Sequence, residues 1–230
     1  MRVAALVLGA GRGERLALDV PKAFVPLAGR PLLAHALEAL LACEAIERVV
    51  PVVPAAHCGA LAGHLGPLAG HAKLAPPVAG GAARQDSLAA GLAALPAHFE
   101  LVAVHDAARP FVRAAAVSRV IAAARVHGAA LLAAPAADTI KRVRDGVVVE
   151  TPPREECYAA QTPQVFRADW LREGLEKAAA EGRVATDCSQ LVEALGVRVQ
   201  VVAGDPDNRK ITDAADLAWA ERRLAQGGGA

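Results

Sequence analysis

Aromatic side chains are scarce in this 230-residue sequence. Phenylalanine, tryptophan and tyrosine together make up 3% of it, whereas hydrophobic residues of all kinds make up 54%. Alanine inflates the apolar total, so we expect a core of Ala, Val and Leu side chains in close contact. No apolar run approaches the roughly 18 residues of a membrane-spanning helix, and the run Val3–Leu8 is too short for a signal peptide. These absences predict a cytoplasmic protein.

The sequence also has little net charge and few lysines. A formal charge of +1 and a pI near 7.8 give no overall field that would attract nucleic acid or an anionic membrane, and we expect neither as a partner. Only five lysines occur among the 25 basic residues, so a lysine inside a motif carries more weight than an arginine there. The length suits one α/β domain with its own core, and we expect residues 1–230 to form it.

Cysteine spacing excludes two common structural devices. Cys43, Cys58, Cys157 and Cys188 form no C-x-x-C pair and have no matching pair of histidines. This pattern indicates neither a zinc site nor a disulfide framework. We therefore expect free, buried thiols.

A glycine-rich loop follows the first apolar run, which predicts a buried strand. Glycines at that point let the backbone approach a ligand closely. Their spacing is not G-x-G-x-x-G, because Glu14 stands where the third glycine would fall, and no P-loop motif occurs. Loop amides with two cationic side chains would suit a triphosphate, whereas the alternative is an ordinary turn with basic surface residues. The candidate residues are Gly9, Ala10, Gly11, Gly13, Arg15 and Lys22.

A second glycine turn, Gly80-Gly81, precedes a helix predicted over residues 88–95. It again offers free N–H groups at a helix start. Arg84 and Ser87 stand one turn apart and would share one face of that helix. The turn is therefore a second candidate binding loop, and a helix cap with a surface arginine is the alternative.

The most specific string of the chain is His105-Asp106-Ala107-Ala108-Arg109-Pro110, which follows a predicted strand over residues 101–104. In open α/β sheets, ligands collect where parallel strands end. This rule favours a functional role for Asp106. A cap for the helix that begins near Arg113 is the alternative.

Alternating strands and helices predict an α/β fold with a mostly parallel sheet. Two short runs around Asp145-Gly146 predict a β-hairpin that interrupts this alternation and needs a surface to rest on. A strand over residues 157–164 is expected to end at Thr162-Pro163, because proline blocks further pairing, and to expose the Thr162 hydroxyl. Thr186 and Asp187 are placed to cap a further helix.

Taken together, the motifs resemble one family of nucleotidyltransferases. Five motifs occur in the order typical of 2-C-methyl-D-erythritol 4-phosphate cytidylyltransferases. They are the glycine loop with Pro21-Lys22, the Gly-Gly turn, the string around Asp106, the TPQ motif at Thr162-Pro163-Gln164, and Asp207-Asn208-Arg209-Lys210-Ile211-Thr212. The resemblance runs from about residue 3 to residue 221. It implies a Rossmann-like fold, with a protruding hairpin arm at about residues 137–156 that reaches into a second subunit of a homodimer.

The same resemblance implies the reaction and its participants. CMP would pass from CTP to 2-C-methyl-D-erythritol 4-phosphate, with Mg²⁺ as cofactor and pyrophosphate as product, in the non-mevalonate isoprenoid pathway. It implies catalytic roles toward phosphates for Arg15, Lys22, Arg154 and Lys210. Mg²⁺ would be held mainly by the triphosphate, near Asp106. The implied substrate-binding residues are Gly9, Ala10, Gly11, Gly13, Gly81, Arg84, Ser87, Asp106, Ala107, Arg109, Thr139, Thr162, Thr186 and Asp187.

The chain departs from the family pattern at two places. Ala82 and Ala83 stand where the family usually has a polar or acidic residue, so recognition of cytosine would depend on the backbone. Cys188 replaces a residue that is normally acidic and is interpreted as a tolerated change. Three other functions fit the same motifs: a cytidylyltransferase for another polyol phosphate, such as ribitol 5-phosphate, an enzyme that couples a different nucleotide to a different sugar phosphate, and a nucleotide-binding module without turnover.

Overall fold

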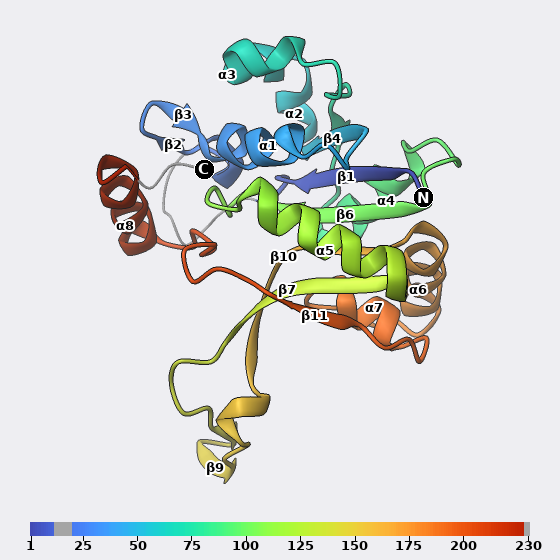
Figure 1. The fold of residues 1–230 in the computed structure, drawn as a ribbon, viewed down its shortest axis with the longest axis vertical. Coiled ribbons are helices and arrows are strands. Elements are labelled where there is room, and N and C mark those ends of the chain that lie inside the picture. Colours follow the sequence, from blue (N-terminus) through green and yellow to red (C-terminus); the bar gives the residue numbers. More distant parts are fainter. Residues whose placement is uncertain (12–19, 228–230) are drawn as a thin grey trace.

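The computed structural model describes residues 1–11 and 20–227. Its centre is a seven-stranded sheet in the order β11-β7-β10-β6-β1-β4-β5 (Figure 1). All neighbouring strands in it run parallel except β10, which is antiparallel to both β6 and β7. The mostly parallel α/β fold expected from the sequence is therefore confirmed. The strands of this sheet are β1 Val3–Leu8, β4 Arg48–Val53, β5 Val78–Ala79, β6 Leu101–Asp106, β7 Ala129–Pro135, β10 Tyr158–Arg167 and β11 Gln200–Ala203.

Helices cover both faces of the sheet. They are α1 Leu32–Ala42, α2 Ala55–Cys58, α3 Leu61–Leu65, α4 Arg84–Ala93, α5 Ala114–His127, α6 Ala168–Ala180, α7 Ser189–Glu193 and α8 Ala214–Ala225. Short 3₁₀ turns are η2 Lys22–Phe24, η3 Gly66–Gly70 and η4 Arg154–Glu156, and two small hairpins pair β2 Pro26–Leu27 with β3 Arg30–Pro31, and β8 Arg142–Arg144 with β9 Val147–Glu150.

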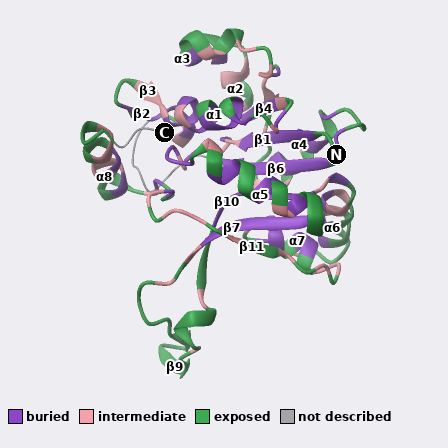
Figure 2. Cartoon of the chain, in the orientation of Figure 1, coloured by how far each residue is buried: buried purple, intermediate pink, exposed green. Residues whose placement is uncertain are grey.

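Strand β1 shows why its residues form a buried strand. Side chains alternate between the faces of a strand, so Val3, Ala5 and Val7 pack with residues of α1 and α5, whereas Ala4 and Leu6 pack with residues of α4, α6 and α7. A strand covered on both faces needs a continuous apolar run rather than alternation. Alanine is abundant in both layers, as the composition predicts, and Figure 2 shows the sheet buried along its central strands.

Strand β10 differs from the expectation drawn from its proline. The strand does not stop at Pro163 but runs on to Arg167, where residues 164–167 pair with β6. Its ladder with β7 is interrupted between Ala160 and Gln164 and then resumes. The proline is accommodated at this irregularity, which is where prolines inside sheets are tolerated. Consequently Thr162 is buried, and the prediction that its hydroxyl is exposed is wrong.

The predicted hairpin around Asp145-Gly146 is confirmed as β8 and β9. Both turn residues have positive φ, 50° and 77°, which suits the Asp-Gly pair. The hairpin projects away from the sheet and is exposed along its length (Figures 1 and 2). We call residues 137–156, which include it, the arm.

The four cysteines are free, as expected, but only two are buried. Cys43 and Cys188 lie in the core, whereas Cys58 and Cys157 are half-buried. The expectation of buried thiols is therefore wrong for those two. In the part of the chain that the structure describes, no helix combines the length and apolar character needed to cross a bilayer.

Candidate active site

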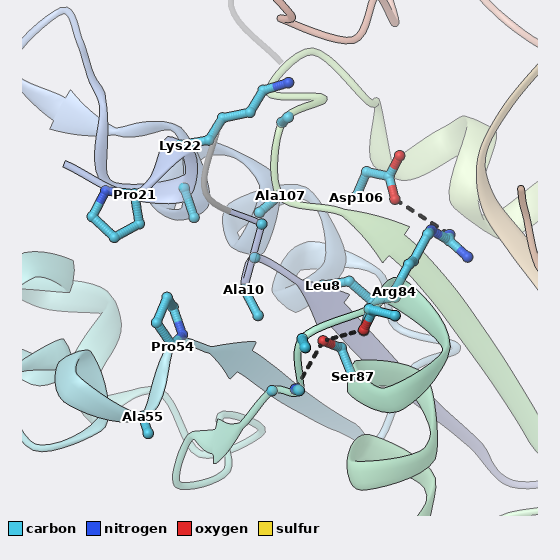
Figure 3. Close-up of a pocket in the computed structure, with 18 of the residues that line it drawn as sticks. Leu8, Ala10, Pro21, Lys22, Pro54, Ala55, Arg84, Ser87, Asp106 and Ala107 are labelled. Carbon is cyan, nitrogen blue, oxygen red and sulfur yellow. Dashed lines mark hydrogen bonds and ion pairs between the residues drawn. The ribbon is translucent and has the colours of Figure 1, made fainter. Parts of the chain in front are cut away.

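A cavity of about 1040 Å³ opens at the carboxyl ends of β1, β4, β5 and β6. This is the edge of an open α/β sheet at which ligands are expected to bind. Figure 3 shows Asp106 and Arg84 meeting on one side of it, with Lys22 and Pro21 coming from another. The described residues that line it are Leu8, Gly9, Ala10, Gly11, Val20, Pro21, Lys22, Ala23, Pro54, Ala55, Gly80, Gly81, Ala82, Ala83, Arg84, Ser87, Asp106, Ala107, Ala108, Lys210 and Thr212.

The first glycine of the loop after β1 is required by close packing. A Cβ at Gly9 would stand 2.9 Å from the Cβ of Ala23, closer than real Cβ atoms come, and 3.2 Å from that of Ala107, a tight contact. The N–H of Gly9 donates to the carbonyl of Val52 at 2.7 Å. The expectation that loop amides cradle phosphates is therefore wrong for this amide, whose role is to join the loop to β4.

The second glycine turn is shaped by the start of α4. The hydroxyl of Ser87 accepts from the N–H of Gly81 at 3.2 Å and donates to the carbonyl of Ala83 at 3.2 Å. The N–H of Ala83 donates to the carboxylate of Asp86 at 2.9 Å, which caps the helix. A side chain at Gly80 would overlap the methyl group of Ala10, so the two glycine loops touch at the cavity wall.

The main charges in the cavity form a cluster around Asp106. Lys210 donates to Oδ2 of Asp106 at 2.8 Å, and Arg84 donates to Oδ1 at 3.3 Å. Burial would raise the pKa of Asp106, but Arg84 and Lys210 outweigh it and hold this pKa below its ordinary value. The carboxylate therefore stays ionised at neutral pH and fixes two cations at the cavity wall.

Cys188 holds the other side of the Arg84 guanidinium. Arg84 donates from Nη1 to the sulfur of Cys188 at 3.0 Å while Nη2 faces Asp106. Burial raises the pKa of the Cys188 thiol even though Arg84 opposes it, and the thiol is therefore neutral near pH 7. Burial would lower the pKa of Arg84, but Cys188 and Asp106 raise it on balance. The substitution at position 188 thus leaves a polarizable partner for Arg84 in place of an anion.

Lys210 is carried by the loop between β11 and α8, and α8 anchors that loop. Asp216, in the first turn of α8, accepts from the N–H and the hydroxyl of Thr212 and from the Arg209 guanidinium. The guanidinium also lies over the Trp219 ring, 4.7 Å from its centroid. These contacts on both sides of Lys210 keep its main chain at the cavity.

The cavity unites ten of the predicted site residues. They come from five segments of the chain that are far apart in sequence, and each contributes to the same wall or opening. The group consists of Gly9, Ala10, Gly11, Lys22, Gly81, Arg84, Ser87, Asp106, Ala107 and Lys210.

Six predicted residues lie outside the lining. Arg109 and Thr162 are engaged behind the cavity wall, where Arg109 donates to the carbonyls of Asn208 and Ala160. Thr186 bonds to Gln190, and Asp187 accepts from side chains of Gln164 and Ser189. Thr139 and Arg154 are exposed on the arm. Two further candidates, Gly13 and Arg15, lie outside the described residues.

Four lining residues lie outside every stretch that the sequence reasoning singled out. Pro54 and Ala55 follow β4, and Val20 and Ala23 flank Pro21-Lys22. The end of the apolar run at Val53 was a usable signal for the first two, because residues just past a parallel strand lie at the ligand-binding edge. Within residues 1–11 and 20–227, no group of three or more His, Cys, Asp or Glu side chains could hold a metal ion.

The mostly parallel sheet, the two glycine loops and a cationic cavity at the strand ends define a nucleotidyltransferase. The comparisons with known proteins agree. The chain belongs to the 2-C-methyl-D-erythritol 4-phosphate cytidylyltransferase family, whose model matches residues 3–226.

Relatives with that name match over nearly their whole length. The protein of Geotalea uraniireducens is 43% identical over 226 residues, which is 97% of each chain. That of Pelotomaculum thermopropionicum is 41% identical over 99% of each chain.

Two solved structures have the same fold. The 4-diphosphocytidyl-2C-methyl-D-erythritol synthase of Anaerococcus prevotii is 29% identical, with a TM-score of 0.86 over 97% of this chain and 98% of its own. The 2-C-methyl-D-erythritol 4-phosphate cytidylyltransferase of Thermus thermophilus is 36% identical, with a TM-score of 0.77 over 98% of this chain and all of its own. The predicted fold and family are therefore confirmed.

Proposed function

We propose that the cavity at the strand ends is where this chain carries out the reaction of its family. The enzyme transfers CMP from CTP to 2-C-methyl-D-erythritol 4-phosphate and releases pyrophosphate. A phosphate oxygen of the acceptor attacks the α-phosphorus of CTP, the bond to the pyrophosphate oxygen breaks, and 4-diphosphocytidyl-2-C-methyl-D-erythritol forms. The observation that carries the assignment is the cluster of Arg84, Asp106 and Lys210 in one cavity with Lys22.

The reaction requires the protein to supply positive charge rather than a nucleophile or a general base. The second pKa of a phosphate monoester is about 6, so the attacking oxygen is already mostly deprotonated near neutral pH. The difficulty is to bring two polyanions together in line and to stabilise the charge of the leaving pyrophosphate. Among the described lining residues, Lys22, Arg84 and Lys210 carry three positive charges and Asp106 carries one negative charge, a net charge of +2. This balance suits the two polyanions.

The individual roles follow from the positions of these cations. Lys22, beside the loop after β1, would stabilise the α-phosphate and the pyrophosphate, and the sequence assigns Arg15 to the same task. Lys210 would position the attacking phosphate of the acceptor. Asp106 sets the place of Lys210 and Arg84, because it binds one with each oxygen. Removing one charge that acts on the transition state typically costs on the order of 10²-fold in rate.

A divalent metal fits this donor set only in one way. Asp106 is the sole carboxylate among the described lining residues, and both of its oxygens already accept from cations. Mg²⁺ tolerates a single protein carboxylate when phosphate oxygens and waters fill the rest of its octahedron. We therefore assign Mg²⁺ mainly to the triphosphate, with Asp106 as the protein carboxylate available to it. When bound, it would neutralise phosphate charge.

The arm supports a homodimer in which each subunit completes the other's site. Thr139 and Arg154 lie on it, and the family resemblance implies that both hold the acceptor phosphate at the neighbouring subunit. The arm exposes a row of apolar side chains, including Val143, Val147 and Val148, at 53% or more of their surface. Exposed apolar groups on a two-stranded hairpin are stabilised when another surface covers them.

The experiment is pyrophosphate release with CTP and Mg²⁺, with 2-C-methyl-D-erythritol 4-phosphate and ribitol 5-phosphate offered in parallel. We expect release with the first acceptor and at most a trace with the second. Release with ribitol 5-phosphate alone would move the chain to activation of another polyol. CTP binding without release from either acceptor would leave a binding module.

A further inference from the structure

A closed ring of hydrogen bonds lies behind the cavity wall. Thr162 Oγ bonds to Nδ1 of His105 at 2.9 Å, and Nε2 of His105 bonds to the carbonyl of Arg109 at 3.1 Å. The Arg109 guanidinium donates to the carbonyl of Asn208 at 2.7 Å. Asn208 Nδ2 donates to the carbonyl of Thr162 at 2.9 Å and closes the ring.

The direction of both bonds made by the His105 ring is fixed by its neighbours and its burial. The carbonyl of Arg109 can only accept, so Nε2 of His105 carries a proton. Burial lowers the pKa of His105 to about 4, so the ring is neutral near pH 7 and Nδ1 is unprotonated. Nδ1 therefore accepts from the Thr162 hydroxyl, whose oxygen in turn accepts from the N–H of Asp106 at 3.1 Å. The ring thus holds a neutral histidine in the Nε2–H tautomer.

Burial leaves the polar groups of the ring few alternative hydrogen-bond partners. His105 has no exposed surface, and Thr162 and Asn208 retain 4% and 1% of theirs. Water does not replace a lost partner easily at such positions, and an unpaired buried polar group is costly. The three buried residues are therefore held in one mutual geometry, and the half-buried Arg109 is bonded to two main-chain carbonyls beside them.

The ring joins strand β10 to the two segments that carry Asp106 and Lys210. His105 immediately precedes Asp106 at the end of β6, Thr162 stands in β10, and Asn208 lies two positions before Lys210. Asp106 and Lys210 meet on the cavity side at 2.8 Å. The ring spans the same junction on the side away from the cavity. A change in its geometry would therefore alter the approach of Lys210 to Asp106.

We propose that His105, Arg109, Thr162 and Asn208 are positioning residues that set the placement of Lys210 against Asp106 for the reaction. The inference rests on the proposed function and adds to it, because it gives Arg109 and Thr162 a role through the ring. The backbone bond from Ile211 to the carbonyl of Ala108, at 2.8 Å, keeps the loop attached if the ring is broken. Breaking the ring should thus misplace Lys210 without releasing it.

The first test is Thr162→Val, which keeps the side-chain shape and removes the hydroxyl. Misplacement of a positioned group by about 1 Å can cost 10²-fold in rate, and we expect kcat/KM for the acceptor to fall about 10- to 100-fold. The Kd for CTP should stay within about 3-fold, since Lys210 is assigned to the acceptor phosphate. Thr162→Ser restores the hydroxyl and should recover most of the loss. Val120→Ala, a buried change in α5, controls for general destabilisation.

A double variant tests whether the ring acts through Lys210. In a Lys210→Ala background, Thr162→Val should lower the rate by less than about 3-fold, because the group that it displaces is gone. Multiplication of the two single losses would overturn the proposal. So would an active Thr162→Val enzyme with unchanged constants for the acceptor.

Nitrogen NMR of histidine-labelled enzyme without substrates tests the ring apart from activity. His105, assigned by comparison with His105→Gln, should show a protonated Nε2 and an unprotonated Nδ1 at pH 7. The opposite tautomer would overturn the ring, even if Thr162→Val does not fold. If unsubstituted enzyme releases no pyrophosphate with methylerythritol phosphate, the proposed function fails and the positioning role with it. If the unsubstituted enzyme releases pyrophosphate and the Thr162→Val variant releases it equally well, the positioning role alone is contradicted.

Discussion

Two ion pairs of equal length stand in very different parts of this molecule. Lys210 meets Asp106 in the cavity at 2.8 Å, and Arg142 meets Glu150 on the arm at 2.8 Å. The Asp106 side chain is 11% exposed, whereas those of Arg142 and Glu150 are 65% and 49% exposed. The carboxylate in the cavity has a second cation, Arg84, on its other oxygen.

The comparison teaches that distance alone does not give an ion pair its importance. Exposed pairs gain little, because water screens the charges and two long side chains lose freedom. A partly buried carboxylate has lost most of its water, so its cations become necessary and removing one partner leaves an uncompensated charge. The cavity cluster is therefore a fixed electrostatic feature, and the arm pair is a surface contact. Four substitutions or conditions test this difference, from the largest expected effect to the smallest.

Lys22→Ala should remove most activity while leaving the fold intact. We expect kcat to fall on the order of 10²-fold or more, because in the proposed mechanism the side chain stabilises charge that develops in the transition state. The melting temperature should change little. Steady-state pyrophosphate release provides the measurement, and Lys177→Ala, on α6 and outside the cavity, is the control for loss of one lysine. An unchanged turnover number would remove Lys22 from the mechanism.

Stability should depend on pH through His105. Burial lowers the pKa of His105 from 6.5 to about 4. Between these two pH values His105 is therefore neutral in the folded chain and protonated in the unfolded chain. The stabilisation is fully present above pH 6.5 and is lost as the pH falls from about 6.5 to 4, a loss of about 3 kcal/mol at most. Urea unfolding at several pH values across this window measures it. The His105→Gln variant, whose side chain does not titrate, should be less stable at pH 7, and its free energy of unfolding should depend less steeply on pH. An equal pH dependence in the two proteins would contradict the prediction.

Asp106→Asn keeps the size of the side chain and removes its charge. Arg84 and Lys210 would then lie close together without a counter-charge, and we expect a loss of about 2 kcal/mol in the free energy of unfolding. Raising the salt concentration should recover part of the loss, since screening weakens the repulsion between the two cations. Chemical denaturation at low and high salt gives both quantities. A variant as stable as the parent protein would show that the cluster has no structural role.

Arg142→Ala on the arm is the counterpart of Asp106→Asn and should have the smallest effect of the four. The pair with Glu150 is exposed, so its loss should change the free energy of unfolding by less than about 0.5 kcal/mol. The same denaturation experiment measures it. A loss as large as that of Asp106→Asn would mean that the arm pair is covered in solution, as it would be at a subunit contact.

Sequence patterns located the framework of the fold and most of the cavity. The apolar runs of β1, β4 and β6 are continuous because both faces of these strands are buried, which makes them easy to recognise. Asp106 was found because a carboxylate at a strand end is unusual and lies where ligands bind. The Asp-Gly turn of the arm was found because its backbone conformation restricts the residues that can occupy it.

The remaining features depend on contacts between distant parts of the chain. Arg84 meets Cys188 across 104 positions, and His105 meets Thr162 across 57, so no local pattern reports either contact. The resemblance assigned Thr162 to the substrate, whereas the structure gives its hydroxyl to His105 and to the main chain of Asp106. Pro163 indicated a strand end because the irregularity that accommodates it, between Ala160 and Gln164, appears only in the pairing of β10 with β7.

The place of β10 in the sheet has a consequence for the order of assembly during synthesis. β10 pairs with β6 on one side and β7 on the other, yet it emerges from the ribosome about fifty residues after β6 is complete. Until then β6, which is apolar from Leu101 to Val104, presents an unpaired edge, and such edges promote association between chains. The nascent chain must therefore protect the strand that carries Asp106 until the segment after the arm has been made. Slow translation between residues 106 and 158 would be expected to lower the yield of folded enzyme without any change in its sequence.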